Sequence, residues 1–143
     1  MSPNPLRAAA GLLLAALALL AGCTVQHHTE QAKALAESFY RALHDDDLEA
    51  AAARLAGKKP QAAWLDELRA RKLRLGRLQR YRLKKIEYNT VFSGTYYVMT
   101  FETAYSRGTA TETLTLFEPV NQAGHLQAVA LQVEARPIEA PIH

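Results

Sequence analysis

The fold is decided by residues 95–118, which read TYYVMTFETAYSRGTATETLTLFE. On both sides of Arg107-Gly108, β-branched and aromatic residues alternate with polar ones. A period of two is typical of strands, and a two-residue turn that contains glycine joins antiparallel neighbours. The stretch therefore predicts a β-hairpin with strands Thr95–Ser106 and Thr109–Glu118.

The position of the loop sets the register of this hairpin. If Arg107 and Gly108 alone form the loop, Ser106 pairs with Thr109, and a slip by one residue would mix polar side chains into the apolar face. The apolar face then consists of Tyr97, Met99, Phe101, Leu114 and Leu116. The expected pairs are Phe101 with Leu114, Met99 with Leu116, and Thr103 with Glu112.

Two further strands extend the hairpin into a meander. Tyr81–Asn89 precedes it through a turn at Ser93-Gly94, and His125–Glu134 follows it through a loop over residues 121–124. This loop length continues the apolar face onto the last strand. The pairs expected there are Leu116 with Val129 and Leu114 with Leu131.

Upstream of this meander the apolar period is close to four, which predicts helices. A good N-cap and helix-ending glycines separate them. The expected helices run from Glu30 to His44, from an N-cap at Asp47 or Asp46 through Leu55 to a closing Gly57, and from Pro60 in the first turn to Gly76.

Helices that precede a one-faced antiparallel sheet define the fold class as α+β, with N-terminal helices packed on a curved sheet of about four strands. The side chains expected to cover the sheet are Leu35, Phe39, Leu43, Trp64 and Leu68. The domain is expected over residues 30–135. Residues 136–143, which hold two prolines, are expected to be a flexible tail.

The N-terminus has the layout of a secretory signal. A short segment with Arg7 precedes the apolar run Ala8–Leu20, whose 13 residues are too few to span a bilayer as a stable helix. The following Leu20-Ala21-Gly22-Cys23 resembles the bacterial lipobox, whose cysteine is lipidated on sulfur and begins the mature chain. A transmembrane anchor, or an uncleaved core segment with an ordinary cysteine, are the alternatives.

The lipobox resemblance implies a signal peptide over residues 1–22 and a lipidated tether over residues 23–29. Since Cys23 is the only cysteine, no disulfide is expected in the mature chain. Thr24, rather than aspartate, follows the cysteine, which among Gram-negative lipoproteins favours the outer membrane. The expected location is the cell envelope, at the outer membrane and facing the periplasm.

The order of helices and strands resembles the cystatin-like, nuclear-transport-factor-type cone. The segments that carry the resemblance are Phe39–Leu43, Leu75–Leu78, Gly94–Val98, Phe101–Thr103 and Glu112–Leu116. Over residues 31–133 the chain also resembles an uncharacterised bacterial domain family of that superfamily. The resemblance implies helices on a curved sheet and, as in some members, a pocket with isomerase or dehydratase chemistry, but it brings no assigned activity.

Glu112 is the one candidate catalytic residue. It falls on the apolar face with Tyr97 and Tyr105 as possible donors, which suits the general base of a pocket. The alternative is an ion pair near the rim with an arginine of the preceding segment. Two motifs could suggest a metal site, His27-His28 and the aspartates at 45–47. The histidines are expected to be surface residues and the aspartates to cap a helix, so no metal or cofactor is expected.

Residues 69–85 include nine Lys or Arg and no acid. Without Arg7 the mature chain has 16 basic and 14 acidic residues, an excess too small to indicate nucleic-acid binding. The run predicts either a solvated face whose stems cover apolar surface or a contact for anionic lipid, lipopolysaccharide phosphate or an acidic partner. The candidates for such a contact are Arg71, Arg74, Arg77 and Arg80.

These features predict a non-enzymatic envelope lipoprotein, held at the membrane by lipid on Cys23, whose small α+β domain binds a protein partner or a ligand. Two alternatives remain open. One is a pocket enzyme with Glu112 as base, and the other is an anionic-surface binder that uses residues 69–85.

Overall fold

Helices and strands occupy separate halves of the chain. The computed structural model describes residues 28–138, in which an N-terminal helix over residues 28–44 is followed by α2 (Leu48–Leu55) and α3 (Gln61–Leu75). The strands are β1 (Leu78–Val91), β2 (Gly94–Tyr105), β3 (Gly108–Pro119) and β4 (Gln127–Pro137).

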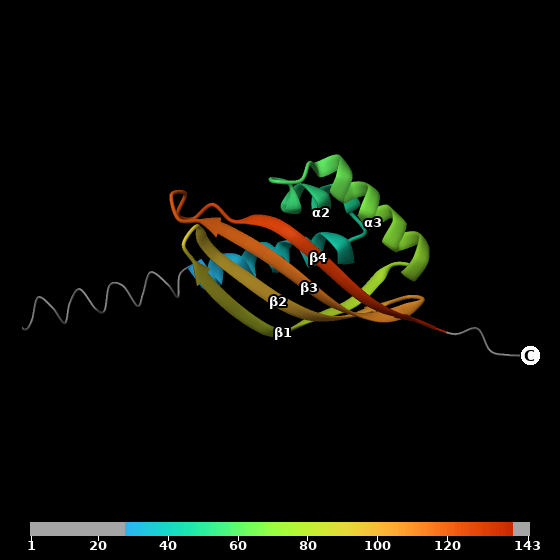
Figure 1. Ribbon diagram of the computed structural model, residues 1–143. Helices are drawn as coiled ribbons and strands as arrows, with labels where there is room; N and C mark the ends of the chain where they lie inside the picture. The colour runs from blue at the N-terminus through green and yellow to red at the C-terminus, as the bar shows by residue number, and fades with distance from the viewer. Residues whose placement is uncertain (1–27, 139–143) are drawn as a thin grey trace, which may run out of the picture.

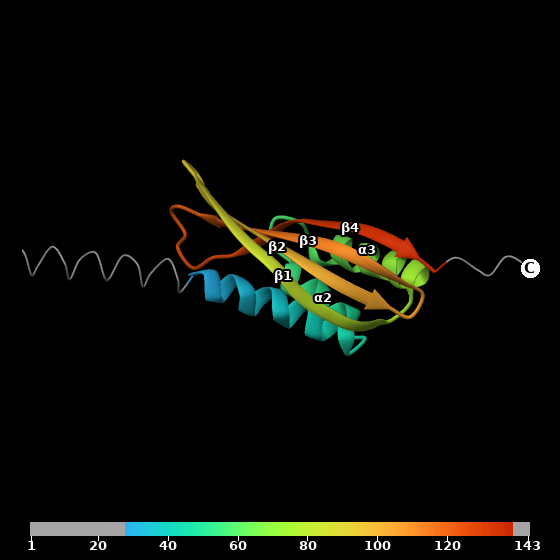
Figure 2. The same ribbon diagram turned by 90° about the horizontal axis from the view of Figure 1, so that it is seen from below.

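The four strands form one antiparallel sheet in the order β1-β2-β3-β4. The sheet is curved, and the helices lie on one face of it (Figures 1 and 2). The predicted α+β class, with helices packed on a curved sheet of four strands, is confirmed.

Local sequence accounts for the ends of the helices. The Asp47 carboxylate accepts a hydrogen bond from the Ala50 backbone N–H at 3.0 Å, and thereby caps α2 as predicted. Gly76, with φ 82°, ends α3 as predicted. Pro60 is the N-cap of α3 rather than a residue of its first turn. Gly57 does not close α2, because the helix has already ended at Leu55 with an extended residue after it.

The β2–β3 loop lies one residue earlier than the sequence predicts. Tyr105 pairs with Gly108, so the loop consists of Ser106 and Arg107. Backbone hydrogen bonds hold both loop residues against the corner between α3 and β1: Ser106 N–H donates to Arg77 O at 2.9 Å and Arg107 N–H to Leu75 O at 2.8 Å. These tertiary contacts determine which two residues form the loop, and the alternation pattern of a hairpin does not contain them.

The consequence is a shift of two residues in the register of the hairpin. Phe101 pairs with Glu112 instead of Leu114, and Met99 pairs with Leu114 instead of Leu116. Because side chains alternate with a period of two, a shift of two keeps each one on its predicted face. The predicted apolar face of the hairpin is therefore buried in full.

The last strand differs from its prediction in two places. Leu131 pairs with Leu114 as predicted, but Leu116 pairs with Ala128 rather than Val129, because the register shifts between Thr115 and Leu116. β4 also continues through Pro137, so its end includes two residues that the prolines had suggested for a tail. Residues 139–143 lie outside the described residues.

The core lies between the helices and the inner face of the sheet. Four of the five side chains expected to cover the sheet are buried and Leu35 is partly buried; the buried four are Phe39, Leu43, Trp64 and Leu68. Residues 28 and 29, expected in the tether, already belong to the N-terminal helix. Cys23 and the signal segment lie outside the described residues.

Replacement of Gly76 by alanine is expected to destabilise the protein more than the same change at Gly124. Both glycines have a positive φ, 82° and 84°, so an alanine is strained by about 1 kcal/mol or more at either site, and the ψ of −156° at Gly76 adds to this because that region is essentially restricted to glycine. At Gly76 the new Cβ would also overlap Ser106 Oγ, whereas at Gly124 no atom lies within 4 Å of it. We expect an additional loss of about 1–3 kcal/mol for Gly76→Ala in urea unfolding. Equal losses would contradict the tight corner between α3 and the β2–β3 loop.

Candidate functional site

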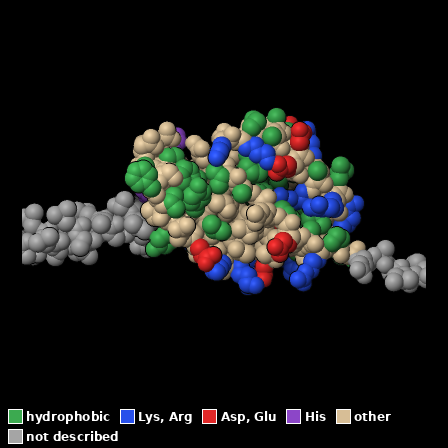
Figure 3. All heavy atoms as spheres, viewed as in Figure 1, with side chains coloured by type: hydrophobic (Ala, Val, Ile, Leu, Met, Phe, Trp, Pro, Cys, Tyr) green, Lys and Arg blue, Asp and Glu red, His purple; other side chains and the backbone are tan. Residues whose placement is uncertain are grey.

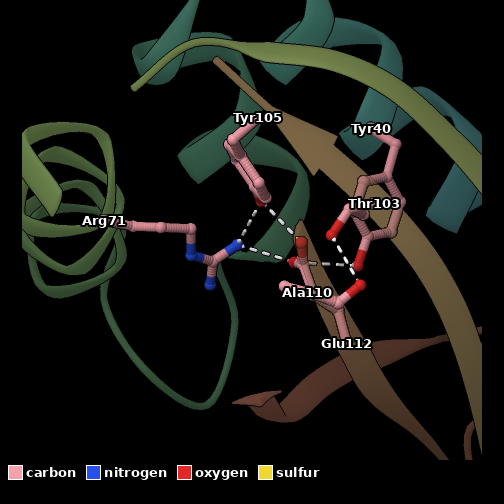
Figure 4. Close-up of polar contacts among 6 residues, drawn as sticks. All are labelled: Tyr40, Arg71, Thr103, Tyr105, Ala110 and Glu112. Atoms are coloured by element: carbon pink, nitrogen blue, oxygen red, sulfur yellow. Dashed lines mark hydrogen bonds and ion pairs between the residues drawn. The ribbon is translucent and has the colours of Figure 1, made fainter. Parts of the chain in front are cut away.

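A buried polar cluster lies in the core between α3, the N-terminal helix and the sheet (Figure 4). Its centre is Glu112 of β3, which is fully buried, and its cation is Arg71 of α3, which is 7% exposed. Arg71 Nη1 donates to Glu112 Oε1 at 2.8 Å. A buried carboxylate requires such a partner, because an unpaired charge in the core carries a large desolvation penalty.

Two tyrosines complete the shell of the carboxylate. Tyr105 OH donates to Glu112 Oε2 at 2.5 Å, and Tyr40 OH donates to Oε1 at 3.2 Å. The Tyr40 ring also packs on Phe101, with centroids 4.2 Å apart. Next to the cluster, Thr103 Oγ1 donates a hydrogen bond to the backbone carbonyl oxygen of Ala110 in β3 at 3.2 Å. Both carboxylate oxygens are therefore occupied by side chains from three different elements.

The protonation of the cluster follows from its burial. Burial first, and the Glu112 charge second, raise the pKa of Tyr105 and of Tyr40 above the ordinary 10.0. Burial opposes the charge of Arg71, but Glu112 and Tyr105 more than offset this, so the pKa of the guanidinium is raised. The tyrosines thus remain neutral donors, and Arg71 remains charged.

This geometry favours a structural role for Glu112 over that of a general base. A base must reach a proton of its substrate, but Glu112 lines none of three cavities bordered by the described residues. Its partners Arg71 and Tyr105 border only the smallest of these, which has a volume of about 10 Å³. The alternative of an ion pair with an arginine of the preceding segment is what the structure contains. The pair lies deep in the core and not near the rim.

The structure removes Arg71 from the predicted anionic contact, because its guanidinium is buried against Glu112. A signal for this was present in the sequence. Trp64, Leu68, Arg71 and Leu75 follow the spacing of one helix face, and all four are buried. The three other predicted contact residues, Arg74, Arg77 and Arg80, are exposed.

The outer face of the sheet carries a shallow open trough of about 860 Å³ near the β2–β3 loop, and its lining also reaches inner-face residues such as Tyr81 and Thr103 and, at the end of the N-terminal helix, His44. Two cross-strand rows make up most of its lining. In order from β1 to β4, the first row is Arg80, Ala104, Thr109 and Arg136, and the second is Arg82, Glu102, Thr111 and Glu134. We call this surface the outer-face trough.

The two rows differ in their charge pairing. Glu102 accepts hydrogen bonds from Lys84 at 2.8 Å and Arg82 at 2.6 Å, and these two cations, Lys84 first, lower the pKa of its carboxyl. Among the described residues, Arg80 and Arg136 have no ion-pair partner. They stand at the two ends of one row, about 14 Å apart at three strand spacings.

Only short side chains, Ala104 and Thr109, lie between these two arginines. Two guanidinium groups on either side of a low floor suit a carboxylate or phosphate, which each arginine can bind through paired N–H donors. Sequence reasoning identified Arg80 but missed Arg136, which it assigned to the tail. The register of β4 is what brings Arg136 to the trough.

Two other polar groups that the sequence analysis considers for metal binding, Asp46 and His28, form ion pairs within the domain. Asp46 binds Lys72 Nζ at 2.7 Å, and this contact lowers the pKa of its carboxyl. His28 Nδ1 lies 3.0 Å from Glu118 Oε1, while His27 falls outside the described residues. Within residues 28–138, no group of three or more His, Cys, Asp and Glu side chains is arranged to hold a metal ion.

Comparison with known proteins does not assign a function to this chain. The chain matches no protein-family model and no curated protein. In the part of the chain that the structure describes, no helix combines the length and the hydropathy needed to cross a bilayer.

Replacement of Tyr105 by phenylalanine is expected to weaken the alkaline loss of stability. Because the pKa of Tyr105 is raised in the folded state, the unfolded chain releases this proton first, and stability falls as pH rises above about 10. Below that pH the folded and unfolded states bind the proton equally, and the phenol contributes no slope.

The measurement is the free energy of unfolding between pH 8 and pH 11.5. Tyr105→Phe should reduce the slope above pH 10 by about 1.4 kcal/mol per pH unit, the value for one proton. Tyr96→Phe is the matched control, since Tyr96 lies on the other face of the same strand and its hydroxyl has no hydrogen bond among the described residues. Identical slopes for the two variants would refute the buried-phenol assignment.

Proposed function

We propose that this protein is a lipoprotein of the bacterial cell envelope whose α+β domain binds an acidic protein partner and catalyses no reaction. The observation that carries the proposal is the Leu20-Ala21-Gly22-Cys23 motif after a short apolar run, since it gives the chain an export signal and an acylation site together. Thr24 supports outer-membrane sorting, with the domain facing the periplasm.

The non-enzymatic part of the proposal is supported by the saturation of Glu112. A carboxylate whose oxygens are both engaged by Arg71, Tyr40 and Tyr105 is poorly placed to take a proton from a substrate. The pocket-enzyme alternative would require this cluster to open. The helix-then-meander order also supports a cone-type domain of the cystatin-like superfamily, within which binding modules and enzymes share one scaffold.

The acidic class of partner is supported by the outer-face trough. Arg80 and Arg136 are exposed cations without an ion-pair partner among residues 28–138, whereas Arg71 of the basic segment is paired with Glu112 in the core. Exposed cations gain more from an incoming anion than cations that already have one. Of the four arginines for which the sequence predicts an anionic contact, Arg71, Arg74, Arg77 and Arg80, the trough contains only Arg80, and Arg136 joins it there.

Acylation at Cys23 is tested directly by mass and by labelling. In a Gram-negative host, the purified chain is expected to begin at Cys23 with the added mass of its acyl chains, and to incorporate an alkyne fatty acid. Cys23→Ala should incorporate none, because its sulfur is the attachment point. An intact mass with a free thiol at position 23 and Met1 still present would refute the anchor.

Partner binding is tested in the same cells with a photocrosslinking amino acid at Thr109, on the floor of the trough. We expect one discrete adduct that is lost when Arg80→Glu and Arg136→Glu are combined. The matched control is the crosslinker at Ala62, an exposed position of α3 in the helix layer. An adduct that survives both charge reversals, or labelling of abundant background proteins alone, would contradict an acidic partner in the trough.

A further inference from the structure

One end of the sheet exposes apolar side chains without a cover. At the β1–β2 turn Phe92 is fully exposed and Val91 is 39% exposed, and in the β3–β4 loop Val120 is 72% exposed. The two loops lie against each other, because Val120 N–H donates to Ser93 O at 2.9 Å. We call Val91, Phe92 and Val120 the hairpin tip.

The two chain segments that form the hairpin tip lack formal charge. Residues 88–98 and 119–133 contain no Lys, Arg, Asp or Glu, in a chain that has 31 such residues. Glu118, the acid that adjoins the second segment, is 7% exposed and is engaged by His28 and by the Gly124 N–H at 2.8 Å. An apolar point formed by uncharged segments can leave water without the desolvation penalty of an ion.

On the face shown in Figure 3, most Lys and Arg side chains lie toward the other end of the molecule. In Figure 3 hydrophobic side chains collect toward the left end of the visible face, and Lys and Arg side chains collect toward the right. Arg80 and Phe92 are separated along β1 and its turn by twelve residues, which is at most about 40 Å of extended chain. This face of the domain is therefore polarised along the strands, with apolar side chains toward the hairpin tip and basic ones toward the β2–β3 loop.

The hairpin tip lies at the end where the described chain begins. His28, the first described residue, contacts Glu118, which directly precedes the partner of Gly94 at the end of the sheet. Figures 1 and 2 both show the start of the N-terminal helix at the same end of the sheet as these two loops; the β3–β4 loop lies beside it, and the β1–β2 turn projects farther away in Figure 2. Five residue steps separate Cys23 from His28, and they span at most about 17 Å.

We propose that the hairpin tip inserts into the interface of the same lipid bilayer that holds Cys23. The inference rests on the proposed acylation, because the short tether is what keeps this end of the domain near the membrane. Phe92 would enter the headgroup–acyl boundary with Val91 and Val120 beside it, as aromatic and aliphatic side chains of peripheral proteins do. The opposite end of the domain, which holds the β2–β3 loop and the outer-face trough and is called the basic end below, would then point away from that membrane.

The test uses the full acylated protein in phosphatidylcholine vesicles that contain bromine-labelled phosphatidylcholine as a quencher. Phe92→Trp places a reporter at the tip, and Leu73→Trp is the matched control, because Leu73 is 81% exposed on α3 and lines the depression beside the β2–β3 loop. The native Trp64 is buried and provides a constant background.

We expect the added emission of Phe92→Trp to shift to the blue and to lose intensity with the brominated lipid, and that of Leu73→Trp to do neither. Equal emission changes in both variants, or none in Phe92→Trp, would overturn the inference. In vesicles with phosphatidylglycerol, quenching of Leu73→Trp in place of Phe92→Trp would show instead that the basic end faces the membrane.

The outcome is separable from the fate of the proposed function. If the chain carries no acyl mass at Cys23, the proposed function itself fails. If the acyl mass is present and the protein floats with the vesicles, but Phe92→Trp is not quenched, only the insertion of the hairpin tip fails. Phe92→Ser in the acylated protein should leave flotation unchanged, since the lipid remains the principal anchor.

Discussion

The ion pair between Arg71 and Glu112 is the constraint on which the rest of the structure depends. It joins α3 to the middle of β3 inside the core, and Tyr40 adds the N-terminal helix to the same carboxylate. Replacement of such a pair by apolar residues is often neutral for stability, but loss of one partner is strongly unfavourable. The pair therefore selects one arrangement of helices and strands, because few alternative packings of the core keep both the Arg71 and the Glu112 charge paired.

This constraint explains why the register of the sheet is well determined. A slip of β3 by one residue would turn Glu112 to the outer face and leave Arg71 buried without a partner. A different rotation of α3 would take Arg71 out of reach of the carboxylate. The same register aligns Arg80 with Arg136 across the outer face, so the buried pair and the outer-face trough are two consequences of one strand alignment.

The sequence predicted the architecture well, because periodicity records which face of each element is buried. The hairpin, the cap at Asp47 and the helix end at Gly76 are local features, and all three are present. The loop position and the bulge near Leu116 depend on contacts between distant segments, namely Leu75 with Arg107 and β3 with β4. A local pattern does not contain these contacts.

The candidate site was predicted only in part, for a related reason. Glu112 was placed on the apolar face, but its partner could not be chosen among nine cations from spacing alone. Arg71 stands at a core position of α3, and a reading that weighted helical spacing above charge would have selected it. Arg136 lies beyond the predicted end of the last strand and next to Pro137, so the sequence pattern alone does not place it on the sheet.

The most direct test of this account is a double-mutant cycle for unfolding by urea with Arg71→Leu, Glu112→Leu and the double variant. Each single change leaves an unpaired buried charge and should cost about 3–5 kcal/mol. The double variant should lose much less than the sum, with a coupling energy of about 2 kcal/mol or more. Losses that add to within about 0.5 kcal/mol would show that the two side chains act independently, and would contradict the central role of the pair.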